Sequence, residues 1–236
     1  MKTTLHKSNT RGQADYGWLH ANYSFSFGNY HDPSRVHFGL LRVLNDDIVD
    51  PGMGFDLHPH DNMEIVTIPL KGALEHRDNK GGHGIINAGD VQIMSAGTGI
   101  YHSEFNHSKT EAVNLFQVWI FPKVKNIQPR YDQKSFDWLS QKNGFKTVVS
   151  PNENDDTLWI NQNAVFSIGN IDKGISHSYK INFPGNGVYL MVVEGKVNVG
   201  DITLDQRDAL GIEDVTEFTI TATEDSRLVA IEIPMK

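Results

Sequence analysis

Two pairs of side chains in the first half of the chain have the types and the spacing of metal ligands. His58 and His60 flank Pro59, and His102 and Glu104 flank one serine. On an extended strand, side chains at positions i and i+2 point to the same face. If the two strands are neighbours, three imidazoles and one carboxylate converge, and this set suits a divalent transition metal.

The ligand types favour iron, copper, nickel, manganese, cobalt or zinc, and an octahedral ion would keep up to two positions for substrate or dioxygen. The chain has no cysteine, which excludes thiolate metal sites and cysteine nucleophiles. Ten of the eleven histidines precede residue 108, so the site is expected in the first half. The alternative is that these are surface or core histidines without a metal. Two ligand pairs near glycine-rich turns favour the metal site over that alternative.

The elements that must position these side chains are short strands. Apolar segments rich in Val, Ile, Phe and Thr recur along the chain, with Gly, Asn, Asp and Pro between them. This pattern is typical of an all-β sandwich or barrel. A strand, glycine turn, strand arrangement at residues 70–93 recurs at residues 193–212, which indicates two related units in tandem. We expect a metal-binding unit at residues 1–130 and a second unit without ligands at residues 131–236.

Composition narrows the class of protein. The 236 residues carry a formal net charge of −8, with 21% charged and 39% hydrophobic residues, as in a folded domain. An acidic balance argues against direct nucleic-acid binding. The longest apolar run, residues 188–193, is far shorter than the roughly 20 residues of a membrane span. Residues 1–12 lack the apolar region of a signal peptide, so a cytoplasmic protein with no membrane contact is expected.

The ligand pairs lie in segments that resemble the two motifs of the cupin superfamily. The first reads Gly52, five residues, His58-Pro59-His60, three residues, Glu64 and then Gly72. The second reads Gly89, five residues, Ser95-Ala96-Gly97, then His102 and Asn106. Serine stands where the second motif has proline, and the gap before its histidine is longer than usual.

Within that superfamily the chain is most similar to the pirin family, and among pirins to the bacterial pirin-like quercetin 2,3-dioxygenases. The likeness is dense over the first half and present only in outline over the second. It is carried by residues 11–12, 16–19, 24–27, 29–30, 32–33, 41–47, 58–60, 63–65, 92–99, 102–104, 117–120 and 129–131. The resemblance implies a bicupin, two tandem jelly-roll β-barrels, with metal in the N-terminal one only.

The resemblance also implies a ligand set and an activity. Pirins take their carboxylate ligand from the second motif, so His58, His60, His102 and Glu104 are the expected ligands, with iron(II) the first choice of metal. Glu64 is then either a residue that orients an imidazole or a strand glutamate paired with a cation. The implied reaction is metal-dependent cleavage of a flavonol such as quercetin by dioxygen, with release of carbon monoxide and with Glu104 as the proton acceptor.

Two other functions stay open at this point. Pirins are also known as partners of transcription factors and metabolic enzymes, so the metal could set the shape or charge of a surface that binds a protein partner, without catalysis. A cupin can also act on a different small molecule, because one fold hosts many functions.

Several further residues carry weaker expectations. Asn45, Asp46 and Asp47 are expected in a polar turn between strands. His76 and His83 flank a glycine-rich turn and are expected to be exposed. One face of a strand at residues 117–119 would carry Gln117 and Trp119, which could line the cavity beside the metal or pack in the core.

Overall fold

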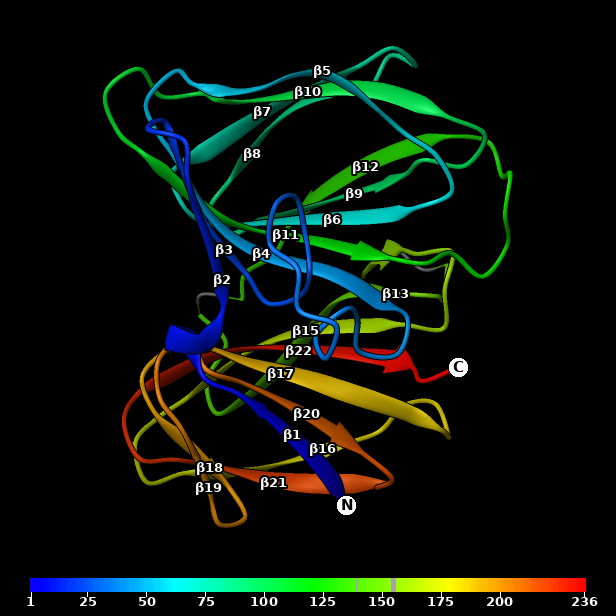
Figure 1. Cartoon of the computed structure of the whole chain (residues 1–236). Helices are drawn as coiled ribbons and strands as arrows, with labels where there is room; N and C mark the ends of the chain where they lie inside the picture. The colour runs from blue at the N-terminus through cyan, green and yellow to red at the C-terminus, as the bar shows by residue number, and fades with distance from the viewer. Residues whose placement is uncertain (139, 154–155) are drawn as a thin grey trace.

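The computed structural model describes residues 1–138, 140–153 and 156–236. Within them the chain is almost wholly β-structure, with one short 3-10 helix, η1 (Ser8–Thr10). The strands form four sheets stacked as layers, a small sheet outside each of two large ones (Figure 1). The predicted all-β architecture of two tandem units is confirmed.

The first unit is made of a seven-stranded and a four-stranded sheet. The large sheet runs in the order β12 (Arg130–Ser135), β9 (Asp90–Ser95), β6 (Glu64–Lys71), β11 (Val113–Ile120), β4 (Leu41–Val49), β3 (Leu19–Tyr23) and β2 (Gly12–Asp15). The small sheet runs in the order β5 (Gly54–His60), β10 (Ile100–Asn106), β7 (Ala73–Asp78) and β8 (His83–Asn87).

The second unit repeats this plan. Its large sheet runs in the order β1 (Lys2–His6), β20 (Ala209–Glu213), β17 (Asn186–Glu194), β22 (Ser226–Pro234), β15 (Val165–Ile171), β13 (Gly144–Ser150) and β14 (Leu158–Trp159). Its small sheet runs in the order β16 (Ser176–Lys180), β21 (Glu217–Ala222), β18 (Val197–Val199) and β19 (Ile202–Leu204).

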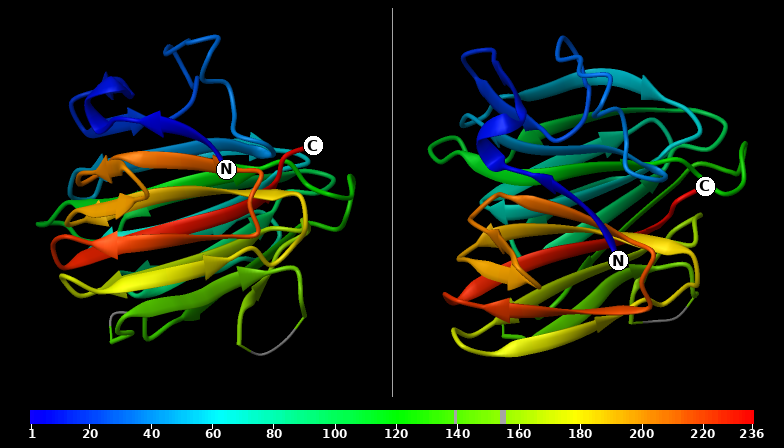
Figure 2. Two further views of the ribbon diagram at one scale, coloured as in Figure 1. Left: turned by 90° about the horizontal axis from the view of Figure 1, so that it is seen from below. Right: turned by 60° about the horizontal axis from the view of Figure 1, so that its bottom comes forward.

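Two strands pair with the unit on the other side of the boundary that was expected between residues 130 and 131. The first strand of the chain, β1, pairs with β20 of the second unit, and β12 pairs with β9 of the first. Figure 2 shows the N-terminal strand beside the strands of the second unit. The division at residue 130 stays a prediction, and each unit has an edge strand from the other part of the chain.

The main core lies between the two large sheets. One cluster of buried residues joins Leu41 and Phe116 of the first unit to Phe166, Tyr189 and Ile231 of the second. Strand β17 is buried on both faces, and its side chains alternate between this core and the interior of the second unit. Such two-sided burial accounts for its continuous apolar sequence.

The interiors of the two units differ in a way that decides where a site can form. The second unit is filled by one apolar cluster, which includes Val188, Leu190 and Leu210. In the first unit the apolar side chains form two separate clusters, one around Tyr23 and one around Ile100. The open interior of the first unit is where the histidine-bearing strands lie.

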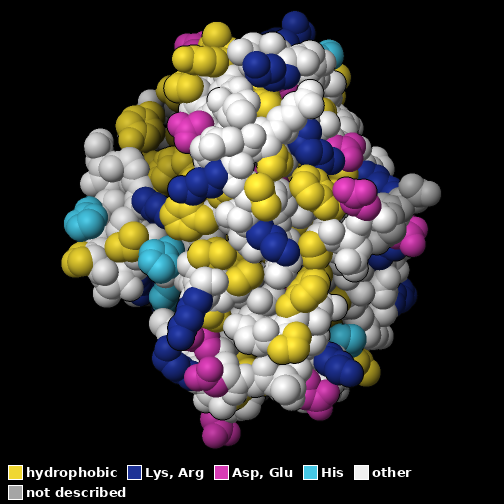
Figure 3. All heavy atoms as spheres, turned by 90° about the vertical axis from the view of Figure 1, so that its right-hand side faces the viewer, with side chains coloured by type: hydrophobic (Ala, Val, Ile, Leu, Met, Phe, Trp, Pro, Cys, Tyr) yellow, Lys and Arg dark blue, Asp and Glu magenta, His cyan; other side chains and the backbone are white. Residues whose placement is uncertain are grey.

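Within the described ranges, no helix has the length and apolar character needed to cross a membrane. One face of the molecule carries Lys and Arg side chains interspersed with Asp and Glu, and hydrophobic side chains lie between them (Figure 3).

Candidate metal centre

Antiparallel pairing of β5 and β10 brings the predicted histidines together. His58 lies directly opposite His102, and His60 lies opposite Ile100. The ring centroids are 4.9 Å apart for His58 and His60, 4.4 Å for His58 and His102, and 4.9 Å for His60 and His102. One ring nitrogen from each of the three lies within 4.8 Å of the others. This spacing is close enough for one ion to bind all three.

Local structure on β5 determines how His58 presents its ring. The register between β5 and β10 shifts between His102 and Glu104, so β5 has one extra residue at this point. The Nδ1 of His58 lies 2.7 Å from the carbonyl oxygen of Asp56. A proton on Nδ1 satisfies this contact, which leaves the Nε2 lone pair free for a metal.

His102 supplies the clearest sign that a metal fits. Its side chain is buried, with 1% of the residue exposed, and its Nε2 has no hydrogen-bond partner in the part of the chain that the structure describes. A buried polar atom without a partner is costly. Metal coordination by Nε2 would remove that cost, so the residues present fit a metal ion.

Burial also keeps the imidazoles of His60 and His102 neutral, as metal ligands must be. Desolvation, with a smaller contribution from the neighbouring histidines, lowers the pKa of His60 to about 4 and the pKa of His102 to about 3. The ring of His60 is held edge-on against Trp119 at a centroid distance of 4.8 Å. At neutral pH both rings therefore keep a free lone pair.

Glu104 is buried beside the histidines and is held by Gln117. The Gln117 Nε2 donates to both carboxylate oxygens of Glu104, at 3.1 Å and 3.0 Å. The Gln117 Oε1 in turn accepts from the Thr67 hydroxyl at 3.1 Å, which fixes the direction of the amide. A carboxylate oxygen of Glu104 lies within 4.8 Å of ring nitrogens of His102 and His76, whereas the group that His102 forms with His58 and His60 does not include Glu104.

A cavity of about 210 Å³ opens beside these residues, between the two sheets of the first unit. Most of its wall surface is apolar, and six of the twelve lining residues bring polar groups to it. The lining residues are Leu19, Ala21, Tyr23, Phe27, Asn45, Asp47, Phe55, His58, His60, Glu104, Gln117 and Trp119. Both Gln117 and Trp119 therefore line the cavity, and an apolar pocket with a few convergent polar groups is typical of a small-molecule site.

The expectation of a polar turn at residues 45–47 is wrong. Asn45, Asp46 and Asp47 are buried in the middle of β4, where Asn45 and Asp47 face the cavity. The Oδ1 atoms of Asn45 and Asp47 have no hydrogen-bond partner among the described residues. Burial, with Asp46 and Glu104 adding negative charge, raises the pKa of Asp47 to about 8. At neutral pH this side chain is largely protonated.

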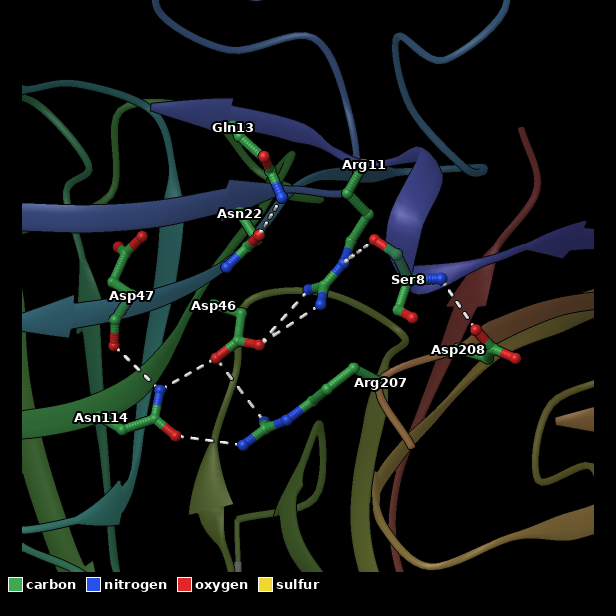
Figure 4. Close-up of polar contacts among 9 residues, drawn as sticks. All are labelled: Ser8, Arg11, Gln13, Asn22, Asp46, Asp47, Asn114, Arg207 and Asp208. Atoms are coloured by element: carbon green, nitrogen blue, oxygen red, sulfur yellow. Dashed lines mark hydrogen bonds and ion pairs between the residues drawn. The ribbon is translucent and has the colours of Figure 1, made fainter. Parts of the chain in front are cut away.

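Asp46 points the other way and joins the two units (Figure 4). Its carboxylate lies 3.4 Å from the Arg11 guanidinium and 3.6 Å from that of Arg207 in the second unit. The amide of Asn114 donates to it at 2.9 Å and to the backbone oxygen of Asp47 at 3.0 Å. These contacts hold β4, and with it one wall of the cavity, against the second unit.

His76 was missed, and the expectation that it is exposed is wrong. It lies on β7 with 0% of the residue exposed, whereas His83 on β8 is exposed as expected. Ring nitrogens of His76 and His102 and a carboxylate oxygen of Glu104 also lie within 4.8 Å of one another. The sequence did carry a signal, because His76 and Asp78 have the same i, i+2 spacing as the ligand pairs.

Glu64 does not orient an imidazole through a hydrogen bond among the described residues, and its relation to a cation is limited to the charge of Arg130, which favours the ionised carboxylate. Its Oε2 accepts from the Ser95 hydroxyl at 2.8 Å and from the backbone N–H of Asn161 at 3.1 Å. These partners place the carboxylate toward the second unit. Glu64 therefore connects the two units, and its hydrogen bonds to described residues reach neither an imidazole nor a cation.

The sequence of this chain is similar to known protein families and to characterised relatives. The family model described as Pirin matches residues 4–120, and the model described as Quercetinase C-terminal cupin domain matches residues 147–233. A quercetin 2,3-dioxygenase of Escherichia coli strain K12 is 40% identical over 230 residues, which are 98% of each chain. The chain belongs to the pirin family. The predicted family is confirmed.

Two further pirins support the assignment. A pirin-like protein of Caulobacter vibrioides is 41% identical over 222 residues, 94% of this chain and 95% of that one. The crystal structure of the bacterial pirin YhhW from Escherichia coli in complex with nickel(II) matches with a TM-score of 0.93 at 39% identity, over 99% of each chain. The predicted divalent metal and the predicted quercetin 2,3-dioxygenase type of enzyme agree with these relatives.

Proposed function

We propose that this pirin is a metal-dependent dioxygenase that cleaves flavonols. The observation that carries the proposal is the convergence of three imidazoles, with the buried Nε2 of His102 lacking a partner, beside an aromatic-lined cavity. The names of its relatives support the same reaction class, because they include quercetin 2,3-dioxygenases of 40% identity over almost the whole chain.

The proposed ligands are His58, His60, His102 and Glu104. When bound there, a divalent metal would supply Lewis acidity that lowers the pKa of a flavonol 3-hydroxyl. We place iron(II) first, since imidazole and carboxylate ligands with open positions suit it, and nickel(II) is supported by the crystal structure of a relative. Cobalt, manganese, copper and zinc are compatible with the same donor set.

Glu104 would take the proton of the 3-hydroxyl. Its two oxygens share one amide donor from Gln117, so lone pairs remain to accept a proton. A positioned carboxylate within reach of the hydroxyl is a suitable general base. Dioxygen then opens the central ring of the electron-rich flavonolate. Both of its atoms enter the ring-opened ester, and the carbon between the two broken C–C bonds leaves as carbon monoxide.

The cavity walls suit the rest of such a substrate. Tyr23, Phe27 and Phe55 offer apolar surface for flat aromatic rings. Asn45 and Asp47 present buried oxygens without partners to the same space. A hydroxyl group both donates and accepts, so ring hydroxyls of a flavonol would satisfy these atoms.

Aerobic turnover tests the proposal. Protein loaded with each metal in turn is mixed with quercetin and with luteolin, which lacks the 3-hydroxyl. We expect loss of the flavonol absorbance and release of carbon monoxide with quercetin only. Glu104→Gln should lose at least 100-fold in kcat, while Glu217→Gln, an exposed glutamate on β21, should match the parent. Fully metal-loaded parent that leaves quercetin intact with every metal would refute the proposed reaction.

A second variant tests the cavity wall. Asp47→Leu removes the carboxyl group but keeps an apolar wall of similar size. We expect it to raise KM for quercetin about tenfold and to leave KM for 3-hydroxyflavone, whose single hydroxyl is the 3-hydroxyl, nearly unchanged. An equal change for both substrates would contradict the role given to Asp47.

A further inference from the structure

A continuous chain of polar contacts runs from His102 away from the proposed metal. The Nδ1 of His102 lies 3.3 Å from the Nδ1 of His76, and the Nε2 of His76 lies 3.1 Å from the Oδ2 of Asp78. All three side chains are buried. They come from two paired strands, because β7 lies beside β10 with Asp78 opposite His102 and His76 opposite Glu104.

Only one placement of protons satisfies this chain when the Nε2 of His102 binds a metal. That nitrogen must present a lone pair, so the neutral His102 ring carries its proton on Nδ1. This Nδ1–H donates to the Nδ1 of His76, which must then have a lone pair. The proton of His76 is therefore on Nε2, where it donates to the Asp78 carboxylate.

The far end of the chain is rigid. The Oδ1 of Asp78 accepts backbone N–H groups from Lys80 at 2.7 Å and from Gly82 at 2.9 Å. The ring of His76 is stacked on Tyr131 of β12 at a centroid distance of 4.5 Å. Asp78 is thereby fixed by its own turn, and the plane of His76 is set by a strand of the large sheet.

We infer that His76 and Asp78 are positioning residues that act through His102. This inference rests on the proposed metal site. The Asp78 carboxylate polarises His76, and His76 fixes the tautomer of His102, holds its ring in place and raises the basicity of its Nε2. Partners of this kind behind a ligating histidine usually contribute 10-fold to 100-fold to metal affinity. His58 relies instead on the Asp56 carbonyl, a weaker partner than a carboxylate.

Direct ligation by His76 is the competing interpretation, because His76, His102 and Glu104 also form a group of suitable spacing. Two features favour the positioning role. The Nδ1 of His76 is at hydrogen-bond distance from His102, and its Nε2 is taken up by Asp78, so both ring nitrogens already have a partner. The Nε2 of His102 also has no described hydrogen-bond partner, as a metal-facing nitrogen should.

Nickel(II) affinity of the full-length protein, measured by competition with a chromophoric chelator, tests the inference without any flavonol. We expect His76→Phe and Asp78→Asn each to weaken binding 10-fold to 100-fold while binding stays at one ion per chain. His76→Gln, whose amide can both accept from His102 and donate to Asp78, should recover part of the loss. His83→Gln on the neighbouring strand is the matched control and should bind as the parent does, because the His83 side chain is exposed and its ring nitrogen lies near Glu75, which is outside the proposed site.

A spectroscopic measurement separates positioning from a general loss of structure. In the zinc-loaded parent, proton and nitrogen NMR should show slowly exchanging N–H signals for Nδ1 of His102 and Nε2 of His76. Asp78→Asn should lose or shift the His76 signal while the circular dichroism spectrum stays that of the parent.

The possible outcomes lead to different conclusions. Unchanged nickel affinity in His76→Phe and Asp78→Asn would overturn the inference. So would complete loss of binding in both His76 variants with parental affinity in Asp78→Asn, because that pattern marks His76 as a ligand. Failure of metal-loaded parent to cleave quercetin would overturn only the proposed reaction, since nickel affinity is measured separately.

Discussion

A buried carboxyl group between the two units should make the stability of this protein depend on pH. Glu64 is 1% exposed, and its Oε1 has no hydrogen-bond partner among the described residues. Desolvation outweighs the hydrogen bonds from Ser95 and Asn161 and raises the pKa of Glu64 from 4.5 to about 7. The folded state therefore keeps this proton over a pH range in which the unfolded chain has released it.

The sign and size of the effect follow from linkage. The folded state binds more protons than the unfolded state between pH 4.5 and about 7, so the free energy of unfolding falls as the pH rises through that window. At ~1.36 kcal/mol per pKa unit, the ionised carboxylate costs about 3 kcal/mol above the window and nothing below it. Glu64→Gln keeps an oxygen for both donors and cannot ionise, so it should not show this loss.

Urea unfolding of the metal-free protein at pH 4 and at pH 8 measures the effect. The quantity to follow is the difference in unfolding free energy between parent and Glu64→Gln, because all other titrating groups cancel in it. We expect this difference to change by about 3 kcal/mol between the two pH values, in favour of the variant at pH 8. Exposed Glu217→Gln is the control and should show no such change. A parent–Glu64→Gln difference that is the same at both pH values would refute the reasoning.

Three other substitutions test separate parts of the structure. Asn106→Ala removes a buried amide that donates to three backbone carbonyls at 2.8–3.1 Å, and thermal and urea unfolding should show a loss of about 3 kcal/mol. Gly54→Ala places a Cβ 2.2 Å from the backbone oxygen of Glu104, so it should force β5 away from β10 and weaken nickel binding at least tenfold; unaltered affinity would contradict this. Asp46→Asn leaves Arg11 and Arg207 without their shared carboxylate. Urea unfolding at neutral pH should show that this variant loses about 3 kcal/mol of unfolding free energy.

The two ligand pairs could be predicted from the sequence, because the members of each pair are close together in the chain. His58 with His60, and His102 with Glu104, lie two residues apart on strands, and strand geometry alone puts each pair on one face. That the two strands are neighbours follows from the superfamily resemblance and not from spacing. The all-β class follows from short apolar segments between turn residues, and it required no tertiary information.

What could not be predicted depends on contacts between distant parts of the chain. A run of Asn45, Asp46 and Asp47 has the composition of a turn, yet β4 carries it because the cavity lies on one side and Arg207 on the other. Burial of His76 depends on its pairing beside β10 and on Tyr131, which is more than fifty residues away in sequence. The exchange of edge strands by β1 and β12 likewise depends on how two sheets meet, which no local pattern encodes.

Metal content is the most direct test of the central claim, that His58, His60, His102 and Glu104 hold one ion. The parent and a His58→Ala/His102→Ala double variant are purified side by side, loaded with nickel(II) or iron(II), and analysed for bound metal. The account predicts about one ion per chain in the parent and almost none in the double variant, with both proteins folded by circular dichroism. Equal metal content in the two folded proteins would contradict it.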